Sequence, residues 1–483
     1  MDEKTIVALE IGSSKIKGAI GIVDANNTLS VKAVEEEKIT DNIVRYGCVI
    51  NVVETVKAVR SVLDRLEQRT NHRKVKKVYI NIGGRSLKSD CIDIERHFPM
   101  ETEITRGILD EMKDEALSRP FADRDVVGAL TREVRIDNTL NPRPVGVMGR
   151  HIITRNDVLS CRSQLLKNIV QVLELRLNLK IKNMFVRPLA EADLVTTTDE
   201  KRLGCMFVDF GAETTSVAIY KQGVLVHLAV LPMGSHNITL DIATLNILEE
   251  RAEEYKIQYG NASGPETHQV VRPIENVDLE TINLYVGARA GEILLNVVEQ
   301  IKYAGLETSQ LAGGVVVTGG GSRLGGLTKR LEEMLGGVKV RIGTPDNRVH
   351  ILDGRIQSAE AVDVIAILAA ATRKGAEECL EPLPQPASHP TEQPAATATT
   401  QYQYPHRGNT PRVTPTPQTE PAPKKEVAAS HPTQPEKTAS TDKSARRKSL
   451  FGDLRDTIRN RVASILTDNL YEESDDNDDE DEN

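Results

Sequence analysis

The stretch IVALEIGSSKIKGAI, residues 6–20, returns about 200 residues later as CMFVDFGAETTSVAI, residues 205–219. Each copy is typical of a buried strand, a turn with an acid, a glycine and small hydroxyl residues, and a second strand. In both copies the acid ends the first strand and the glycine follows two residues later. This repeat predicts an α/β protein with two similar lobes and a cleft between them.

The residues of the repeated turns favour phosphate binding. Gly12 and Gly211 let backbone N–H groups approach an anion closely, and Lys15 adds positive charge. Glu10 and Asp209 can hold Mg²⁺ through water, because this ion retains much of its hydration shell. One such hairpin alone is also an ordinary turn. Two hairpins in equivalent places indicate a cleft that binds a phosphorylated ligand.

A third loop has the residues to complete the cleft. A short apolar run, VVVT at residues 315–318, precedes a glycine turn and then a helix-compatible run over residues 327–335. A strand, a glycine turn and a helix N-terminus together can face a nucleotide. The stretch does not match G-x-G-x-x-G, and G-x-x-x-x-G-K-[ST] occurs nowhere in the chain, which excludes Rossmann and P-loop sites.

Composition limits the other classes of function. The 483 residues include 3% aromatic residues and carry a formal net charge of −9, which argues against nucleic-acid binding. The five cysteines are scattered and form no C-x-x-C pair, which favours a reducing cytoplasm over a disulfide framework or a zinc site. The ten histidines show no metal-binding spacing, so structural roles are expected for them. The N-terminus runs straight into a strand, and no signal peptide is expected.

The C-terminal part of the chain differs in composition from the rest. Residues 376–445 are rich in proline and threonine and lack the apolar content that folding needs, so we expect a disordered linker. Residues 446–471 form an amphipathic pattern with basic residues before and within it. The apolar stripe consists of Leu450, Phe451, Leu454, Ile458, Val462, Ile465 and Leu466. Residues 472–483 form an acidic tail whose role stays open.

The amphipathic segment predicts attachment to a membrane surface. It is too charged to cross a bilayer. A helix with an apolar stripe and arginines fits the headgroup region of an anionic membrane. The alternative is a helix that docks on a protein, either its own body or a partner. The long linker favours the membrane, because a helix that docks on its own body rarely needs such a tether.

The three loops, in this order and spacing, resemble the phosphate-1, phosphate-2 and adenosine motifs of the actin-like ATPase superfamily. Further stretches are similar to the bacterial cell-division FtsA family. They are NIGGRSLKS at residues 81–89, ITR at 104–106, PVGVMGR at 144–150, LPMGSHNITLDIA at 231–243 and AEEYK at 252–256. The resemblance implies an actin-like two-lobed α/β fold of duplicated ribonuclease-H-like domains, with an inserted FtsA-type subdomain.

The resemblance also sets the expected domain boundaries. The first lobe is expected over residues 1–83 and 161–200, the inserted subdomain over 84–160 and the second lobe over 201–375. The linker at 376–445, the membrane-targeting helix at 446–471 and the acidic tail at 472–483 follow. The inserted subdomain is expected to mediate polymer contacts and to recruit later division proteins; a passive surface subdomain is the alternative.

The function implied by the resemblance is that of an ATP-binding protein that polymerises like actin. It would tether the ring of the tubulin-like protein FtsZ to the cytoplasmic face of the inner membrane at the division septum. ATP and Mg²⁺ are the implied cofactors. The residues implied near phosphate, ribose, adenosine and metal are Glu10, Gly12, Ser13, Lys15, Asp209, Gly211, Thr214, Thr215, Gly234, Glu253, Lys256, Gly319, Gly320, Gly321 and Ser322, with Glu10 and Asp209 at the metal.

The sequence departs from the pattern of the superfamily in three places. Glu10 stands where aspartate is usual, and Ala212 and Glu213 stand where glycines are common. Glu213 adds negative charge beside the phosphates unless it points outward. Arg187 precedes Pro188 where catalytically active relatives carry an acid, so no general base for water is evident. We therefore predict ATP binding with weak or no hydrolysis.

Two other functions stay open on sequence grounds. A phosphotransferase of the same superfamily would need a substrate carboxylate in the cleft and would have no reason for the linker and the terminal helix. A related actin-like scaffold for rods or pili is the other alternative, and the stretch at residues 81–89 discriminates best against it. Arg289 and Lys302, on an expected helix, are candidates for contact with an acidic FtsZ tail, although solvation is the simpler role.

Overall fold

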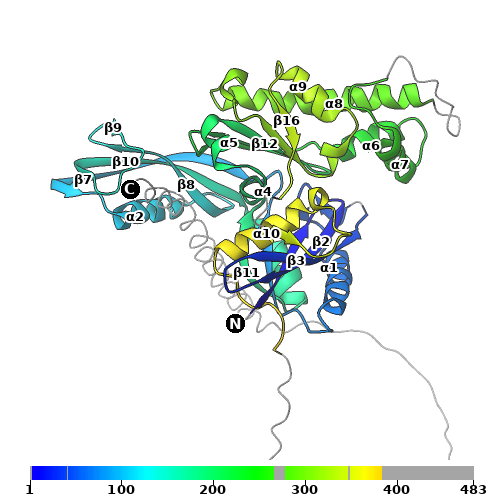
Figure 1. The fold of residues 1–483 in the computed structure, drawn as a ribbon, viewed down its shortest axis with the longest axis horizontal. Coiled ribbons are helices and arrows are strands. Elements are labelled where there is room, and N and C mark those ends of the chain that lie inside the picture. Colours follow the sequence, from blue (N-terminus) through cyan, green and yellow to red (C-terminus); the bar gives the residue numbers. More distant parts are fainter. Residues whose placement is uncertain (1–2, 41, 266–277, 346–348, 383–483) are drawn as a thin grey trace, which may run out of the picture. The chain divides into compact units, whose positions relative to one another are not determined.

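The computed structural model describes residues 3–40, 42–265, 278–345 and 349–382 (Figure 1). The predicted linker beyond residue 382, the membrane-targeting helix with its apolar stripe from Leu450 to Leu466, and the acidic tail lie outside the described residues. Three clusters of buried apolar side chains divide the described part into a first lobe, a second lobe and a smaller inserted subdomain. In the described residues no helix has both the length and the apolar character to span a membrane.

The first lobe is built on a six-stranded sheet with the order β11-β6-β1-β2-β3-β17. Its strands are β1 (Lys4–Ile11), β2 (Lys15–Val23), β3 (Leu29–Lys38), β6 (Lys77–Ile82), β11 (Lys180–Val186) and β17 (Val349–Ile351). Helices cover both faces of this sheet. Gly18 of β2 packs closely against Val62 and Leu66 of α1 (Val52–Gln68), whereas Gly21 packs against Leu368 of α10 (Val362–Arg373).

The second lobe has a five-stranded sheet with the order β14-β13-β12-β15-β16. Its strands are β12 (Cys205–Phe210), β13 (Thr215–Lys221), β14 (Val224–Leu231), β15 (Val315–Thr318) and β16 (Val340–Ile342). Neighbouring residues of β12 contribute to different cores. Phe207 packs with the first lobe and Val208 with the second, because successive side chains of a strand point to opposite faces.

The two sheets repeat one topology. Each begins with a three-stranded antiparallel meander, β1-β2-β3 or β12-β13-β14, and continues with two parallel strands on the other side of its first strand. The expectation of a duplicated two-lobed α/β fold is therefore confirmed. The repeated sequences occupy the same position in both sheets, the first hairpin of the meander.

The inserted subdomain has its own sheet with the order β7-β10-β8-β9. The strands are β7 (Lys88–Glu103), β8 (Arg124–Ile136), β9 (Thr139–Leu140) and β10 (Met148–Arg162). The helix α2 (Arg106–Leu117) begins after Thr105, whose hydroxyl accepts a hydrogen bond from Ile108 N at 3.3 Å. Leu109 and Met112 of this helix are buried in the same core as Ile94 of β7.

The remaining elements connect these three bodies. In the first lobe they are the short hairpin of β4 (Val44–Arg45) and β5 (Cys48–Val49), the helices α3 (Ser163–Val170) and α4 (Arg187–Val195), and a π-helical turn at Gln171–Arg176. In the second lobe they are α5 (Thr198–Leu203), which packs on β12 and β13, α6 (Ser235–Ala243), α7 (Glu249–Tyr259), α8 (Leu279–Tyr303) and α9 (Leu327–Met334). Single 3-10 turns lie at Thr308–Gln310, Gly320–Arg323 and Ser358–Glu360.

The expected C-terminal boundary of the second lobe, residue 375, is wrong. After β16 the chain returns to the first lobe, where β17 pairs with β3 and α10 packs on β1 and β2. The expected start of the linker at residue 376 is also wrong, because Cys379 N donates to Thr5 O at 2.8 Å and Leu380 is buried. Sequence pattern missed this return because the apolar residues of α10 suit either lobe equally well.

The position of the first lobe's C-terminal boundary predicts that two leucine-to-alanine substitutions lower the free energy of unfolding by unequal amounts. Leu380→Ala should lower the free energy of unfolding by about 2–4 kcal/mol, because it empties a buried site. Leu352→Ala, at a leucine that is 60% exposed, is the matched control and should change stability by less than about 0.5 kcal/mol. Urea unfolding of the full chain measures both values, and equal small effects would contradict the boundary.

Candidate functional site

The turns of the two repeated hairpins close with the same hydrogen bond. Gly12 N donates to Lys15 O at 3.1 Å, and Gly211 N donates to Thr214 O at 2.9 Å. A side chain at either glycine would crowd this turn, since its Cβ would lie 2.9 Å from Lys15 O or 2.8 Å from Thr214 O. The duplicated sequence therefore produces two turns of the same local geometry, each directly after an acidic residue.

The third loop lies against the second acid. β12 and β15 are parallel neighbours with Asp209 opposite Thr318, so the glycine turn after Thr318 begins beside Asp209. Gly319 has a φ of 84°, and its Cβ would lie 2.4 Å from Asp209 Oδ1, which excludes any other residue there. Ser322 Oγ donates to Gly319 O at 2.7 Å and closes the turn.

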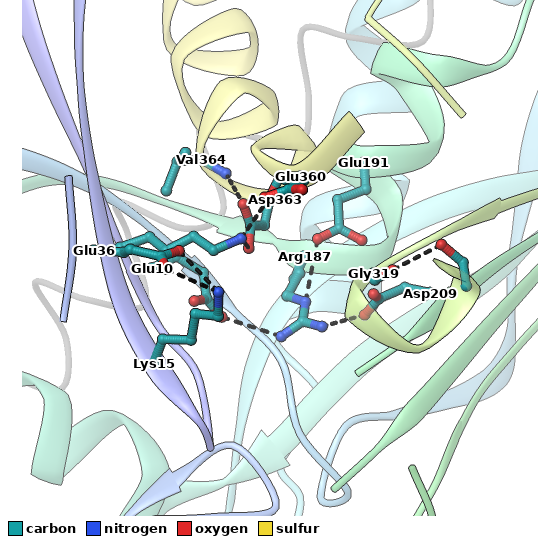
Figure 2. A network of polar contacts seen from close by, with 12 residues as sticks. Glu10, Lys15, Glu36, Arg187, Glu191, Asp209, Gly319, Glu360, Asp363 and Val364 are labelled. Carbon is teal, nitrogen blue, oxygen red and sulfur yellow. Dashed lines mark hydrogen bonds and ion pairs between the residues drawn. The ribbon is translucent and has the colours of Figure 1, made fainter. Parts of the chain in front are cut away.

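Arg187 joins the two acidic residues (Figure 2). Its Nη1 lies 3.1 Å from Glu10 Oε1, and its Nη2 forms an ion pair with Asp209 Oδ2. Its Nε lies 3.2 Å from Glu191 Oε1, one helical turn further along α4. Arg187 is the first residue of α4, and Pro188 favours helix initiation there because its φ is already fixed.

Burial strengthens the interactions between the charges of this cluster and shifts the pKa values of its side chains. Burial raises the pKa of Glu10 to about 7, and repulsion from Asp363 and Asp209 adds to the shift that Arg187 and Lys17 oppose. Burial likewise raises the pKa of Glu191 well above its usual range, helped by repulsion from Asp209. Burial lowers the pKa of Arg187, but its carboxylate partners outweigh this and keep the guanidinium charged.

A second cation supports the same cluster from the first lobe. Lys17 Nζ lies 2.7 Å from Asp363 Oδ2 and donates to Glu360 O at 2.6 Å, which ties β2 to the first turn of α10. Asp363 raises the pKa of Lys17 against the effect of burial. The returning C-terminal helix therefore supplies an acid to the site, and the charges of both Asp363 and Lys17 act on Glu10.

The charge of Glu213 is neutralised within the protein. Its carboxylate pairs with Arg45 Nε at 2.5 Å and accepts a hydrogen bond from Tyr46 N. The side chain is 8% exposed, so it does not point outward to solvent. This acid of the second turn therefore contacts the β4–β5 hairpin of the first lobe, and its pairing removes the objection that it would repel a phosphate.

Of the other residues predicted near phosphate, the hydroxyl residues lie in the turns, whereas Lys15 points elsewhere. Ser13 Oγ accepts from Gly47 N at 3.2 Å, and Thr215 Oγ1 donates to Met233 O at 2.9 Å, so both are engaged in the turns; Thr214 is buried. Lys15 extends instead to Glu36 of β3, with 2.9 Å between Nζ and Oε1, and Figure 2 shows this pair apart from Asp209.

The expected ribose-side residues form a network of their own. Lys256 Nζ lies 2.6 Å from Glu253 Oε2 and donates to Thr239 Oγ1 at 2.8 Å and Ser235 O at 3.1 Å. Ser235 N in turn donates to Gly211 O at 2.9 Å, which connects this network to the second turn.

Where this network meets the second turn, there is little room for a side chain at Gly234 or Gly321. A Cβ at Gly234 would lie 2.4 Å from Ala212 O, and one at Gly321 would lie 3.2 Å from the Ser235 Cβ. Gly320 differs, since open space surrounds its Cβ position.

Comparison with known proteins identifies the family. The family model described as "Cell division protein FtsA" matches residues 206–366. The cell division protein FtsA of Pseudomonas aeruginosa is 30% identical over 71% of this chain and 83% of its own length. The chain belongs to the FtsA family. The FtsA protein of Porphyromonas gingivalis is 27% identical over 72% of this chain and 76% of its own length.

A solved structure supports the fold. A chain of the PilM–PilN type IV pilus biogenesis complex matches with a TM-score of 0.54 and 19% identity, over 76% of this chain and 98% of that chain. At this identity the match shows the fold alone. This FtsA-family chain is thus a cell-division protein with the actin-like two-lobed architecture, and its inserted sheet is the FtsA-type subdomain.

Two buried donors beside the cluster fit a bound ligand. Within the described residues, Asn81 Nδ2 and Thr318 Oγ1 are buried without a hydrogen-bond partner. Asn81 lines a small cavity together with Glu10, Gly47 and Arg187, and Thr318 lies opposite Asp209. Unpaired buried polar groups are costly, so these two atoms favour a polar ligand such as a nucleotide in this FtsA-family cleft.

A metal ion between Glu10 and Asp209 fits less well. Carboxylate oxygens are suitable ligands for Mg²⁺. The guanidinium of Arg187, however, already contacts Glu10 Oε1 and Asp209 Oδ2 and takes the position between them that a metal would need. The two residues expected to hold the metal are therefore brought together by an arginine instead.

Sequence reasoning missed several members of the site. In the sequence, Arg187 is only a departure from the superfamily pattern, and Glu191 gives no signal beyond its i,i+4 spacing from Arg187. Asp363 and Lys17 meet only because the chain returns to the first lobe at β17. Asn81 belongs to the stretch that resembles the FtsA family, but its sequence context gives no sign of a role in the site.

The raised pKa of Glu10 predicts a pH dependence of stability. Folding takes up a proton between pH 4.5 and 7, since the pKa of Glu10 rises from 4.5 to about 7 in the folded state. The free energy of unfolding should therefore fall as the pH rises through this window. The contribution of Glu10 is at most about 3 kcal/mol.

Glu10→Gln removes this titration and should make the dependence shallower when urea unfolding is measured from pH 5 to pH 7.5, while the raised pKa of Glu191 keeps a remaining slope of the same sign. Glu36→Gln, at an acid that is 44% exposed, is the control and should keep the slope of the unchanged protein. Equal slopes for the unchanged protein and Glu10→Gln would show that Glu10 does not titrate in this range.

Proposed function

We propose that this FtsA-family protein binds ATP in the cleft between its lobes, assembles like actin and anchors the FtsZ ring to the cytoplasmic face of the inner membrane. The observation that carries the proposal is the pair of identical glycine turns, each behind an acid, with unpaired buried donors beside them. Backbone N–H groups of such turns suit phosphates, and the third turn after β15 suits the base and ribose.

Arg187 would supply the positive charge that a divalent ion supplies in many phosphate sites. A guanidinium presents five donors in a plane and forms bidentate contacts with phosphates as readily as with carboxylates. In the described structure it lies between the acids of both turns, where phosphates held by those turns would come within reach. A Mg²⁺ ion would accompany the nucleotide without a place between Glu10 and Asp209.

The geometry favours ATP as a structural ligand over ATP as a substrate. A general base for water needs a carboxylate or imidazole free to accept a proton. Glu10, Asp209 and Glu191 all contact the guanidinium of Arg187, and Asp363 contacts Lys17. Hydrolysis is therefore proposed to be weak. The same engagement disfavours a phosphotransferase, whose substrate hydroxyl would also need a free base.

Membrane attachment is proposed from the sequence of residues 446–471. The apolar stripe and the arginines suit the interface of an anionic bilayer. One helix of this size binds lipid weakly, so many copies on one polymer would provide avidity. The inserted subdomain is proposed to recruit later division proteins, and the family membership supports this role. The chain's return places its last described residues in the first lobe, so the linker would leave from there.

Substitution of Arg187 tests its role at the nucleotide. If Arg187 supplies the cation, the unchanged protein should bind ATP with similar affinity with Mg²⁺ or with EDTA. Arg187→Ala should lose about tenfold or more in EDTA, because a charged hydrogen bond contributes about 1.5–3 kcal/mol. It should recover binding with Mg²⁺, because Glu10 and Asp209 are then free to accept the ion.

Titration calorimetry with ATP measures these affinities. Arg187→Lys retains the charge without the planar donors and should show an intermediate loss. Arg341→Ala removes an ion pair with Glu200 outside the cleft and is the control for altered stability. Loss of ATP binding by the unchanged protein in EDTA would contradict the proposed role of Arg187 but not the nucleotide site itself.

Recruitment of FtsZ to vesicles tests the function as a whole. Fluorescent FtsZ from the same organism should collect on anionic vesicles only when this protein and ATP are present. Ile458→Glu should reduce recruitment strongly, because it places a charge on the apolar stripe. Asn460→Glu adds the same charge on the opposite side of a helix and is the matched control. FtsZ recruitment that is equal with and without the protein would refute the anchoring role.

A further inference from the structure

A cluster of two histidines and one glutamate lies on the inserted sheet, away from the nucleotide cleft. Strands β7 and β10 are antiparallel neighbours, with His97 opposite His151 and Glu95 opposite Ile153. Glu95 and His97 are two residues apart on β7 and therefore share one face of the sheet with His151. Residues 54 positions apart in sequence thus become direct neighbours through strand register.

The three side chains converge on one point. Glu95 Oε1 lies 2.6 Å from His151 Nε2 and 3.2 Å from His97 Nε2. The imidazole rings stack at 4.2 Å between centroids with an interplanar angle of 4°, so both present the same edge. One ligand atom from each residue lies within 4.8 Å of the others. Donor atoms around a tetrahedral zinc ion are about 3.3 Å apart, a separation within the range that these ligand atoms already span.

The neighbouring charged side chains form ion pairs with one another, so Glu95 interacts with the two histidines. On the same face, Arg155 pairs with Asp93 at 3.0 Å and with Glu133 at 3.7 Å. Among the described residues, Glu95 forms ion pairs only with the two imidazoles. A divalent cation satisfies all three groups at once, since neutral imidazole and carboxylate are its ordinary ligands.

We propose that Glu95, His97 and His151 form a binding site for a divalent transition-metal ion of the zinc class. The donor set of two imidazoles and one carboxylate suits zinc better than Mg²⁺ or Ca²⁺, which favour oxygen ligands throughout. His97 is 71% exposed and His151 19%, so the ion would enter from solvent and keep at least one coordination position open on that side.

The bound ion would fasten the edge of the inserted sheet. β7 is an edge strand, and the pairing of β7 with β10 is irregular next to the cluster, between Gly149 and His151. An edge strand with an interrupted ladder is prone to local opening. Two ligands from β7 and one from β10 would connect the strands at this point. This inference does not depend on nucleotide binding or on the proposed function.

Zinc titration of the full-length, untagged protein tests the site. The unchanged protein, stripped with chelator, should bind one Zn²⁺ more tightly than any other equivalents, measured by competition with a chromophoric chelator. His97→Ala and His151→Ala should each weaken that binding by at least about tenfold. His350→Ala, at an exposed histidine of β17, should leave it unchanged and controls for non-specific histidine binding.

A second readout separates metal binding from folding. Zn²⁺ should raise the protection of β7 amides against hydrogen exchange in the unchanged protein and not in Glu95→Gln, whose uncharged amide preserves the size of the side chain. All variants should show the same exchange without Zn²⁺. The proposal is overturned if His97→Ala and His151→Ala bind Zn²⁺ as the unchanged protein does, or if Zn²⁺ leaves β7 exchange unaltered.

Discussion

The guanidinium of Arg187 is the contact on which the cleft depends. It meets Glu10 at the end of β1, Asp209 at the end of β12 and Glu191 within its own helix. Three buried carboxylates this close would repel one another without a cation, and a buried guanidinium without carboxylates would be equally unfavourable. Removing one partner from such a buried group typically costs about 3–5 kcal/mol. The ion pairs of Arg187 with Glu10 and Asp209 therefore connect the two lobes at the point where their repeated turns meet.

The cluster around Arg187 contains more acidic than basic side chains. Acids from both lobes and from the returning helix surround the cations Arg187 and Lys17. The acids are Glu10, Glu191, Asp209 and Asp363. The excess and the burial together raise the pKa of Glu10 and Glu191, so protons balance part of the charge near neutral pH. A ligand that brings further negative charge will favour the protonated forms, so anion binding and proton uptake are linked in this cleft.

The sequence determines the local part of this architecture more clearly than the non-local part. The repeated strand–turn–strand units and the third glycine turn are short-range patterns, and the structure has them where they were expected. The return of α10 to the first lobe depends on packing between segments more than 300 residues apart, which no local pattern records. The pairing of Lys17 with Asp363 and of His97 with His151 follows from that tertiary arrangement and from strand register. Arg187 was visible in the sequence, but its role required the positions of three acids from separate elements.

The return of the chain also sets a path for mechanical load. The last described residues lie beside the starts of β1 and β6, where Cys379 N donates to Thr5 O, and Glu381 N donates to Lys74 O. A pull on the chain beyond residue 382 is thus borne by the first sheet, along β1, the strand that carries Glu10. Had the chain left from the second lobe, the same pull would act to separate the lobes across Arg187. With this exit, tension on the C-terminal segment enters the first sheet and does not pull directly on the contacts of Arg187 between the lobes.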